Sequence, residues 1–399
     1  MFNDFTNVTS VISDLILFLL QIKTSKMTVS FPYFKNVNFP ERYISPEKLF
    51  SYLQSNYSDY IKEVGKSGLG KPIYMMTLGK GATKIAAWSQ MHGNESTATL
   101  AMLDLLAIFE KHPELKEKLF ELIQLDFIFM LNPDGSEQWT RRNAFDIDIN
   151  RDYLRNSSAE MKILKSVVLT GDYDYLLNLH DQRTIFTTDG KHPATLSFLA
   201  PSESPERAIT ENRKKSMAVI AATYLQMKQM LPNRIAKYTD EFYPTSAGDN
   251  FMKAGIPSVL VEGGFYENDI ERKKTREFYT QALYFAIKAM SVLKGETYSY
   301  ETYLDIPQNK ETHFDLIYRD VRLNTDFECI LDIAVQYREI LDADGKLTYQ
   351  PYVIEVGDVN HKKGWEEIDC KGKKFISDKK FPKLDALVAV SYTHLTLPT

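Results

Sequence analysis

Strand-like and helix-like segments alternate from about Tyr60 to Glu262, and this alternation constrains the fold more than any other feature. Five short runs are dense in apolar residues, as in strands that are covered on both faces: 84–90, 123–131, 173–179, 196–200 and 258–261. Segments with apolar residues at helical spacing separate these runs, among them 204–230 and 269–293. The pattern predicts an α/β domain with a mixed, mostly parallel sheet flanked by helices.

The pattern changes after Gly295. Alternating apolar and polar residues predict strands near 314–321, 327–337 and 347–356, with a turn at 342–345 between the last two. We therefore expect four regions. They are an uncertain N-terminal extension at 1–27, the α/β domain at 28–296, a small and truncated β-rich domain at 297–390, and a tail at 391–399 that resembles translated sequencing-adaptor sequence.

The first residues contain one apolar run, 11–22, which is too short to cross a bilayer as a helix. No basic leader precedes this run and no small-residue cleavage site follows it, so it is a poor secretory signal. The segment is either an additional helix or the result of a translation start placed before the true start at Met27. In both cases we expect a cytoplasmic protein without a membrane partner.

Charge and cysteine content exclude several classes of function. The 399 residues carry a net charge of -5, which argues against binding to nucleic acid or to a membrane through a basic surface. Cys329 and Cys370 are the only cysteines, so neither a disulfide framework nor a thiolate zinc site is expected. Any metal ion in this protein must be held by nitrogen and oxygen ligands.

A candidate metal site begins where the first predicted strand meets a helix. His92 and Glu95 stand three positions apart, close enough to converge on one ion, and Gly93 allows a tight turn between them. His180 ends another apolar strand, where ligands gather in α/β sheets. Glu262 also ends a buried strand. Each of these features has an ordinary explanation when it is considered by itself. The H-x-x-E pattern arises by chance in many chains. His180 could be a hydrogen-bonded histidine at a strand end, and Glu262 could be a surface residue in a turn.

Three further motifs lie between these residues: Asn132-Pro-Asp-Gly135, Thr140-Arg-Arg-Asn143 and Asp148-Ile-Asn-Arg151. In their order, with H-x-x-E before them and a histidine and a glutamate after them, they resemble zinc metallocarboxypeptidases of the carboxypeptidase A type. The resemblance covers roughly 60–293 and points to a compact, bacterial-type branch, which would make 28–296 the catalytic domain.

The resemblance implies a role for each matching residue. His92, Glu95 and His180 would bind one zinc ion per chain, Asp148 would orient His92, and Glu262 would be the general base that takes a proton from water.

The same resemblance places the substrate. Asn150 and Arg151 would bind the free carboxylate of a peptide's C-terminal residue, because a guanidinium pairs with a carboxylate through two hydrogen bonds. Arg141 would stabilise the oxyanion, with Arg142 as the alternative since the spacing does not decide between them. Tyr243 would be a mobile residue that contacts the substrate, although a loop aromatic without such a role is an equal alternative.

Two departures leave the substrate open. Digestive members carry an arginine where this chain has Asn94, and the stretch from Arg141 to Asn150 is shorter than theirs. The motif H-G-N-E is also similar to that of the deacylases of N-acyl amino acids, such as aspartoacylase and succinylglutamate desuccinylase, whereas the motif N-P-D-G favours the peptidases.

We therefore expect a zinc metallocarboxypeptidase that hydrolyses the C-terminal peptide bond of peptides. A zinc-dependent deacylase of N-acyl amino acids is the alternative, and a protein that binds peptides without catalysis is a third hypothesis. The sequence makes no prediction of oligomeric state.

Overall fold

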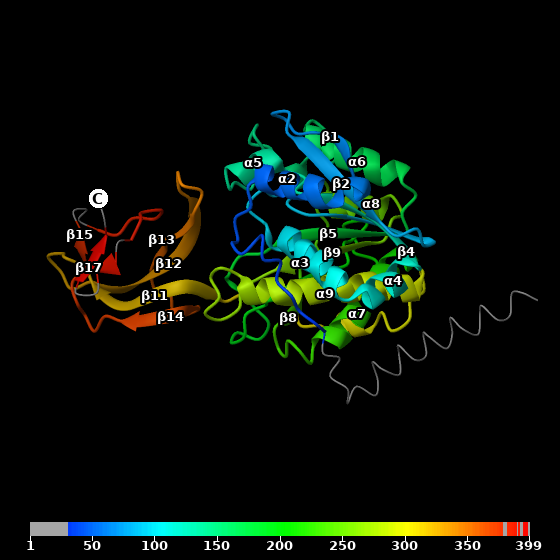
Figure 1. Ribbon diagram of the computed structural model, residues 1–399. Helices are drawn as coiled ribbons and strands as arrows, with labels where there is room; N and C mark the ends of the chain where they lie inside the picture. Colours follow the sequence, from blue (N-terminus) through cyan, green and yellow to red (C-terminus); the bar gives the residue numbers. More distant parts are fainter. Residues whose placement is uncertain (1–30, 378–380, 389, 392–393, 398–399) are drawn as a thin grey trace, which may run out of the picture. The chain divides into compact units, whose positions relative to one another are not determined.

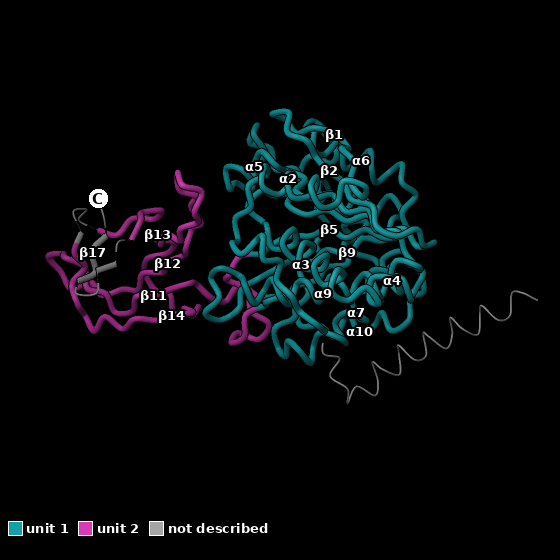
Figure 2. Tube along the Cα trace, in the orientation of Figure 1, with its two compact units in different colours: residues 1–182, 194–309 teal, residues 183–193, 310–399 magenta. Residues whose placement is uncertain are grey.

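The computed structural model describes residues 31–377, 381–388, 390–391 and 394–397. The predicted extension at 1–27 therefore lies outside the described residues. The chain divides into two compact units, shown in Figure 2. Unit 1 comprises residues up to 182 together with 194–309, and unit 2 comprises 183–193 together with the residues from 310 onward.

In the described part of unit 1, eight strands form one sheet in the order β1-β2-β4-β3-β5-β9-β7-β8. Their bounds are β1 (Ile61–Lys66), β2 (Pro72–Leu78), β3 (Thr83–Trp88), β4 (Ile123–Phe129), β5 (Tyr175–Asp181), β7 (Leu196–Leu199), β8 (Ile235–Lys237) and β9 (Ser258–Gly263). The central pairs β4–β3, β3–β5 and β5–β9 are parallel. The pairs β1–β2, β2–β4 and β9–β7 are antiparallel. This mixed sheet confirms the predicted fold class.

Helices cover both faces of the sheet, as Figure 1 shows. One face packs against α3 (Thr97–Lys111), α7 (Glu211–Met227) and α9 (Lys273–Leu293), and the other against α6 (Ala159–Thr170) and α8 (Ala247–Lys253). Side chains along β3 alternate between the two cores, because Ile85 and Ala87 belong to the first and Ala86 and Trp88 to the second. The central strands β3, β4 and β5 therefore bury both of their faces, which explains the apolar runs in the sequence.

Shorter helices complete unit 1: α2 (Pro46–Tyr57), α4 (Pro113–Phe120), α5 (Pro133–Glu137), α10 (Thr302–Asp305) and the 3-10 turns η1 (Ser58–Tyr60) and η2 (Ile149–Arg151). Helix α7 begins later than the predicted residue 204, because the Thr210 hydroxyl accepts a hydrogen bond from the Arg213 amide and caps the helix there. Among the described helices none is both long and apolar enough to cross a bilayer.

A buried ion pair joins α3 and α9. The guanidinium of Arg276 donates to both carboxylate oxygens of Asp104 and to the Phe39 carbonyl, and both charged side chains are almost fully buried. Asp104 also accepts hydrogen bonds from the Tyr33 hydroxyl and the Asn36 amide. One carboxylate thus anchors residues 33–39 to the two helices.

Unit 2 is built from strands. β11 (His313–Arg322), β12 (Ile330–Leu341), β13 (Leu347–Gly357) and β14 (Lys363–Asp369) form a sheet in the order β13-β12-β11-β14. Apolar side chains on one face of this sheet, among them Leu316, Ile333 and Val353, pack with Phe375 and Val388. The remaining short strands are β15 (Ile376–Ser377), β16 (Val390–Ser391) and β17 (His394–Leu397). The C-terminal region is thus β-rich, as predicted.

Residues 183–193 join unit 2 because β6 (Phe186–Thr187) pairs with β10 (Lys310–Glu311). The Trp365 indole also donates a hydrogen bond to the Thr184 carbonyl. In contrast, residues 297–309 remain with unit 1, where the Tyr303 hydroxyl accepts a hydrogen bond from the Ala200 amide. The units therefore meet at 309–310 in the sequence, later than the predicted boundary at 296.

Candidate metal centre and active site

Three neighbouring parallel strands bring the candidate site together. β3, β5 and β9 are adjacent in the sheet, and parallel strands place their C-terminal ends along one edge. His92 follows β3, His180 lies in β5 and Glu262 lies in β9. His180 and Glu262 are direct partners in the pairing of β5 with β9. The sheet topology thus collects residues that are far apart in the sequence.

His92, Glu95 and His180 form a group of three buried ligands that could hold a metal ion. One ligand atom from each residue lies within 4.8 Å of those of the other two. Glu95 Oε1 is 2.9 Å from His92 Nδ1, and Glu95 Oε2 is 2.9 Å from His180 Nδ1. The amide of Asp181 donates to Glu95 Oε2 at 3.2 Å and fixes that oxygen. Two imidazole nitrogens and one carboxylate are a donor set that suits zinc and leaves a coordination position open.

The charges of these three residues also suit a cation. Burial alone would raise the pKa of Glu95, but the two histidines hold it well below its ordinary value, so Glu95 is ionised. Burial lowers the pKa of His180 and keeps that imidazole neutral. Burial also acts to lower the pKa of His92, but Glu95 and Asp148 outweigh it and raise the pKa above its ordinary value. The ionised Glu95 and the neutral His180 therefore suit a divalent metal ion, whose binding would displace the proton that the raised pKa favours on His92.

Asp148 and Arg141 support this group. Asp148 Oδ1 lies 3.1 Å from His92 Nε2, the ring nitrogen that points away from Glu95. Arg141 donates from Nε to Asp148 Oδ2 at 3.2 Å and from Nη1 to Glu95 Oε1 at 3.1 Å. Burial acts to raise the pKa of Asp148, but His92 and Arg141 hold it far below its ordinary value. A carboxylate on the second ring nitrogen fixes the orientation of a metal-binding histidine.

The structure distinguishes the two candidate arginines. Arg141 contacts Glu95 and Asp148, as described above, and 44% of its side chain is exposed. The Arg142 side chain instead donates to the Asp146 carbonyl at 2.7 Å and lies 3.7 Å from the Asp146 carboxylate. Arg141 is therefore brought to the site and Arg142 is not.

Asn150, Arg151 and Tyr243 lie together beside Asp148. Asn150 donates its amide N–H to Asp148 Oδ1, and its side-chain oxygen accepts from the Ala247 amide at the start of α8. The Arg151 guanidinium lies over the Tyr243 ring, 4.0 Å from the ring centre. Half of Tyr243 is exposed. The structure thus brings these three predicted substrate residues together.

Glu262 has the properties of a proton acceptor. Its Oε2 atom is buried and has no hydrogen-bond partner among the described residues. Burial and the nearby carboxylates of Glu95 and Asp181 raise the pKa of Glu262 well above its ordinary value. A carboxylate with a raised pKa accepts a proton more readily than an ordinary one, as a general base must.

The N-P-D-G motif has a structural role beside the metal centre. A Cβ atom on residue 93 would lie 2.1 Å from the Gly135 carbonyl carbon, so only glycine fits at this position. Gly135 in turn donates its amide to the Asn132 side chain. The loop that carries His92 and Glu95 therefore packs directly on this motif.

Sequence reasoning missed Asn178, which stands two residues before His180 in β5 and therefore faces the same side of the sheet. Its side chain is buried, and neither amide atom has a hydrogen-bond partner among the described residues. A polar residue inside the apolar run Tyr175–Leu179 was the signal in the sequence that could have identified it.

The comparisons with known proteins agree with this geometry. The zinc carboxypeptidase family model (Peptidase_M14) matches residues 47–167. No curated protein sequence matches the chain. Similar solved structures include a metallo-carboxypeptidase from Burkholderia cenocepacia, with a TM-score of 0.50 and 17% identity over 63% of this chain and 70% of that chain.

Two animal proteins are also similar. Carboxypeptidase A from Helicoverpa armigera has a TM-score of 0.52 and 13% identity over 70% of this chain and 81% of that chain. Bovine thrombin-activatable fibrinolysis inhibitor, solved with a tick carboxypeptidase inhibitor, has a TM-score of 0.51 and 16% identity over 63% of this chain and 98% of that chain. At these identities the likeness shows the fold alone.

The family match contains His92, Glu95 and Arg151, whereas His180 and Glu262 lie beyond it. Residues 47–167 thus match the model of the family that the order of the motifs resembles.

Proposed function

We propose that this chain is a zinc-dependent metallocarboxypeptidase that releases the C-terminal residue of a peptide. The observation that carries the proposal is the convergence of His92, Glu95 and His180 next to Glu262, whose Oε2 atom is buried without a partner. Held by the first three residues, a zinc ion supplies Lewis-acid activation of water and of the scissile carbonyl.

The protein's own residues account for proton transfer. Glu262 takes a proton from the attacking water, whose oxygen adds to the scissile carbonyl carbon. The C–N bond then breaks, and Glu262 returns the proton to the departing amine nitrogen. The raised pKa of Glu262 makes it a stronger proton acceptor than an ordinary carboxylate.

Arg141 and Arg151 account for the charge of the substrate. Arg141 Nη1 lies 3.1 Å from His92 Nδ1 and 3.1 Å from Glu95 Oε1, the atoms that would ligate the ion. The guanidinium would leave these atoms when they bind an ion, and its exposed side chain can then turn towards the carbonyl oxygen of a substrate. Arg151, stacked on Tyr243, would bind the C-terminal carboxylate through two parallel hydrogen bonds.

The test of this proposal compares three kinds of substrate, before and after chelation, by mass spectrometry. We expect loss of single C-terminal residues from peptides with a free carboxylate, no reaction with the same peptides amidated at the C-terminus, and no reaction after chelation. Hydrolysis of N-acyl amino acids with intact peptides would instead support the deacylase. Binding of peptides without any hydrolysis by the zinc-loaded protein would support the non-catalytic hypothesis.

A variant of Arg151 tests the carboxylate site separately. We expect Arg151→Gln to raise KM by about 10- to 100-fold, since hydrogen bonds to a charged group contribute roughly 1.5–3 kcal/mol. Arg155 is a matched control, because it is an exposed arginine four residues later. Arg155→Gln should leave KM unchanged, and an equal effect of the two variants would contradict the role of Arg151.

A further inference from the structure

The relative position of His180 and Glu262 depends on how the ends of β5 and β9 are held together. The two residues are direct partners in the pairing, and Asp181 and Gly263 are the next pair. The Gln182 amide donates to the Gly263 carbonyl at 2.8 Å, and this is where the pairing of the two strands ends. Strand ends fray easily, so a site built on the last residues of two strands needs additional support.

Arg272 provides such support from outside the two strands. It donates from Nη1 to the Gly263 carbonyl at 2.6 Å and from Nη2 to the Gln182 carbonyl at 2.7 Å. Its guanidinium also lies 3.8 Å from the Asp181 carboxylate, and the residue is buried. One planar group therefore bridges β5 and β9 directly after His180 and Glu262.

The backbone at Arg272 is arranged for this contact. Arg272 directly precedes α9 and has a φ of 56°, a left-handed conformation that side chains other than glycine rarely adopt. Asp269 accepts hydrogen bonds from the amides of Lys273, Lys274 and Thr275 and thereby fixes the start of the helix. The Arg272 amide also donates to the Asp269 carbonyl at 2.9 Å, so Asp269 holds both Arg272 and the first turn of the helix.

Tyr279 supports the same two strands from the preceding positions. Its hydroxyl lies 2.9 Å from the Val261 carbonyl and 3.4 Å from the His180 carbonyl. Tyr279 is fully buried on α9, two turns after Arg272. Arg272, directly before α9, and Tyr279, on α9, therefore contact backbone carbonyls at the ends of both strands around His180 and Glu262.

We propose that Arg272 is a positioning residue that holds the metal ligand His180 and the base Glu262 at their working separation, with Tyr279 assisting. The inference deepens the proposed function and rests on it. The guanidinium acts through the two carbonyl groups that it bridges, those of Gly263 and Gln182. A lysine could not replace it, because an ammonium group lacks the flat pair of N–H donors that matches two carbonyls on neighbouring strands.

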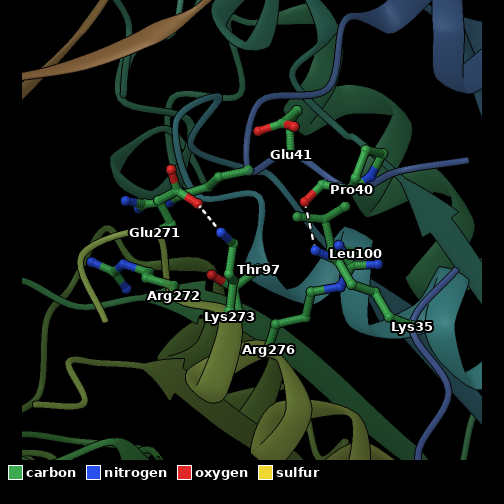
Figure 3. Close-up of a pocket in the computed structure, with 10 residues that line it drawn as sticks. Lys35, Pro40, Glu41, Thr97, Leu100, Glu271, Arg272, Lys273 and Arg276 are labelled. Atoms are coloured by element: carbon green, nitrogen blue, oxygen red, sulfur yellow. Dashed lines mark hydrogen bonds and ion pairs between the residues drawn. The ribbon is translucent and has the colours of Figure 1, made fainter. Parts of the chain in front are cut away.

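The surroundings of Arg272 allow a test by chemical rescue. Arg272 lines a small pocket together with Arg42, Thr97 and Arg276. Figure 3 shows that the side chains of Arg272, which directly precedes α9, and Arg276, in its first turn, point in different directions. In an Arg272→Ala protein, the space left by the removed side chain could take up a guanidinium ion from solution, which would donate to the same carbonyls.

Arg276 offers a matched control on the same helix. It is also buried, also donates to a backbone carbonyl and also pairs with an aspartate, but its partners Phe39 and Asp104 lie outside β5 and β9. Comparison of Arg272→Ala with Arg276→Ala therefore separates positioning of the site from a general loss of buried hydrogen bonds. Tyr279→Phe removes one hydroxyl only and serves as a second variant that keeps the core filled.

The experiment measures kcat, KM and zinc affinity for the wild type and these variants, each at a temperature where it is fully folded. For Arg272→Ala we expect kcat to fall about 10- to 100-fold, KM to change by less than about twofold and zinc to bind about 10-fold more weakly. Guanidinium, well below unfolding concentrations, should restore much of kcat, whereas urea should not. Tyr279→Phe should lower kcat by about 3-fold or more, and Arg276→Ala should leave kcat and zinc affinity unchanged.

The outcomes separate this inference from the proposed function. A wild type that binds zinc but releases no C-terminal residue would refute the proposed function, and zinc affinity would still test the role of Arg272. Unchanged kcat and zinc affinity in both Arg272→Ala and Tyr279→Phe would overturn the inference. A loss in Arg276→Ala as large as that in Arg272→Ala would overturn it as well. If Arg272→Ala fails to fold, Tyr279→Phe decides.

Discussion

The orientation of His92 provides a prediction that can be worked out from the structure. Asp148 Oδ1 lies 3.1 Å from His92 Nε2, its Oδ2 accepts from Arg141, and only 12% of its side chain is exposed. Asp148→Asn keeps the size of the side chain but removes the charge. The new amide would either turn N–H groups towards Arg141 or turn them towards His92, and in both cases one charge-assisted hydrogen bond is lost.

The expected effect is on metal affinity. Loss of the partner of a metal-binding histidine weakens binding by about 10- to 100-fold, which corresponds to about 1.4–2.8 kcal/mol. The assay is a competition for zinc between the protein and a fluorescent chelator near neutral pH. Far-UV circular dichroism of the metal-free protein checks that the variant remains folded.

Asp146 is the control for this variant. It stands two residues earlier in the same loop, its side chain is 91% exposed, and its contact is with Arg142 rather than with a metal ligand. Asp146→Asn removes the same charge and should leave zinc affinity unchanged. Zinc affinity of Asp148→Asn within about twofold of the wild type would refute the proposed role of Asp148, and equal losses in both variants would show a general effect of charge.

Three further predictions concern stability. Asp104→Asn should lower the free energy of unfolding by about 3–5 kcal/mol, because it leaves the buried charge of Arg276 unpaired. Urea denaturation would show this loss as a lower midpoint. A loss below about 1 kcal/mol would contradict this account. Asn178→Leu should raise the free energy of unfolding by about 1–3 kcal/mol, because it removes a buried amide that has no partner among the described residues. A lower free energy of unfolding would instead show that the amide forms hydrogen bonds. Burial lowers the pKa of His313 from 6.5 to about 4. Between pH 6.5 and pH 4 the unfolded chain therefore binds more protons at this residue than the folded chain does. The stability of unit 2 should fall as the pH drops from about 6.5 towards 4. His313→Phe should reduce this acid sensitivity in thermal melts taken across the pH range, and an unchanged sensitivity would refute the assignment.

The central strands could be predicted from the sequence because they are buried on both faces. β3, β4, β5 and β9 are short apolar runs, and the structure places each within a few residues of its prediction. The pairing of β6 with β10 could not be predicted, since it joins residues more than a hundred positions apart through a strand of two residues. For this reason the transfer of residues 183–193 to unit 2 was not foreseen either.

The site was predictable where the contacts are local or belong to a motif. His92 and Glu95 are close in the sequence, whereas the distance of His180 from them depends on the order of strands in the sheet. The choice between Arg141 and Arg142 depends on the path of the loop, because only one of the two side chains points to Asp148. The bridge made by Arg272 left no local pattern, because its partners are carbonyl groups that carry no sequence identity.

The measurement that tests the central claim most directly combines zinc content with hydrolysis in the wild type and in Glu262→Gln. We expect each protein to bind one zinc ion per chain, and we expect only the wild type to release C-terminal residues from peptides with a free carboxylate. Absence of bound zinc in the wild type would contradict the assignment of His92, Glu95 and His180. Full activity of Glu262→Gln would contradict the proposed role of Glu262 as the base.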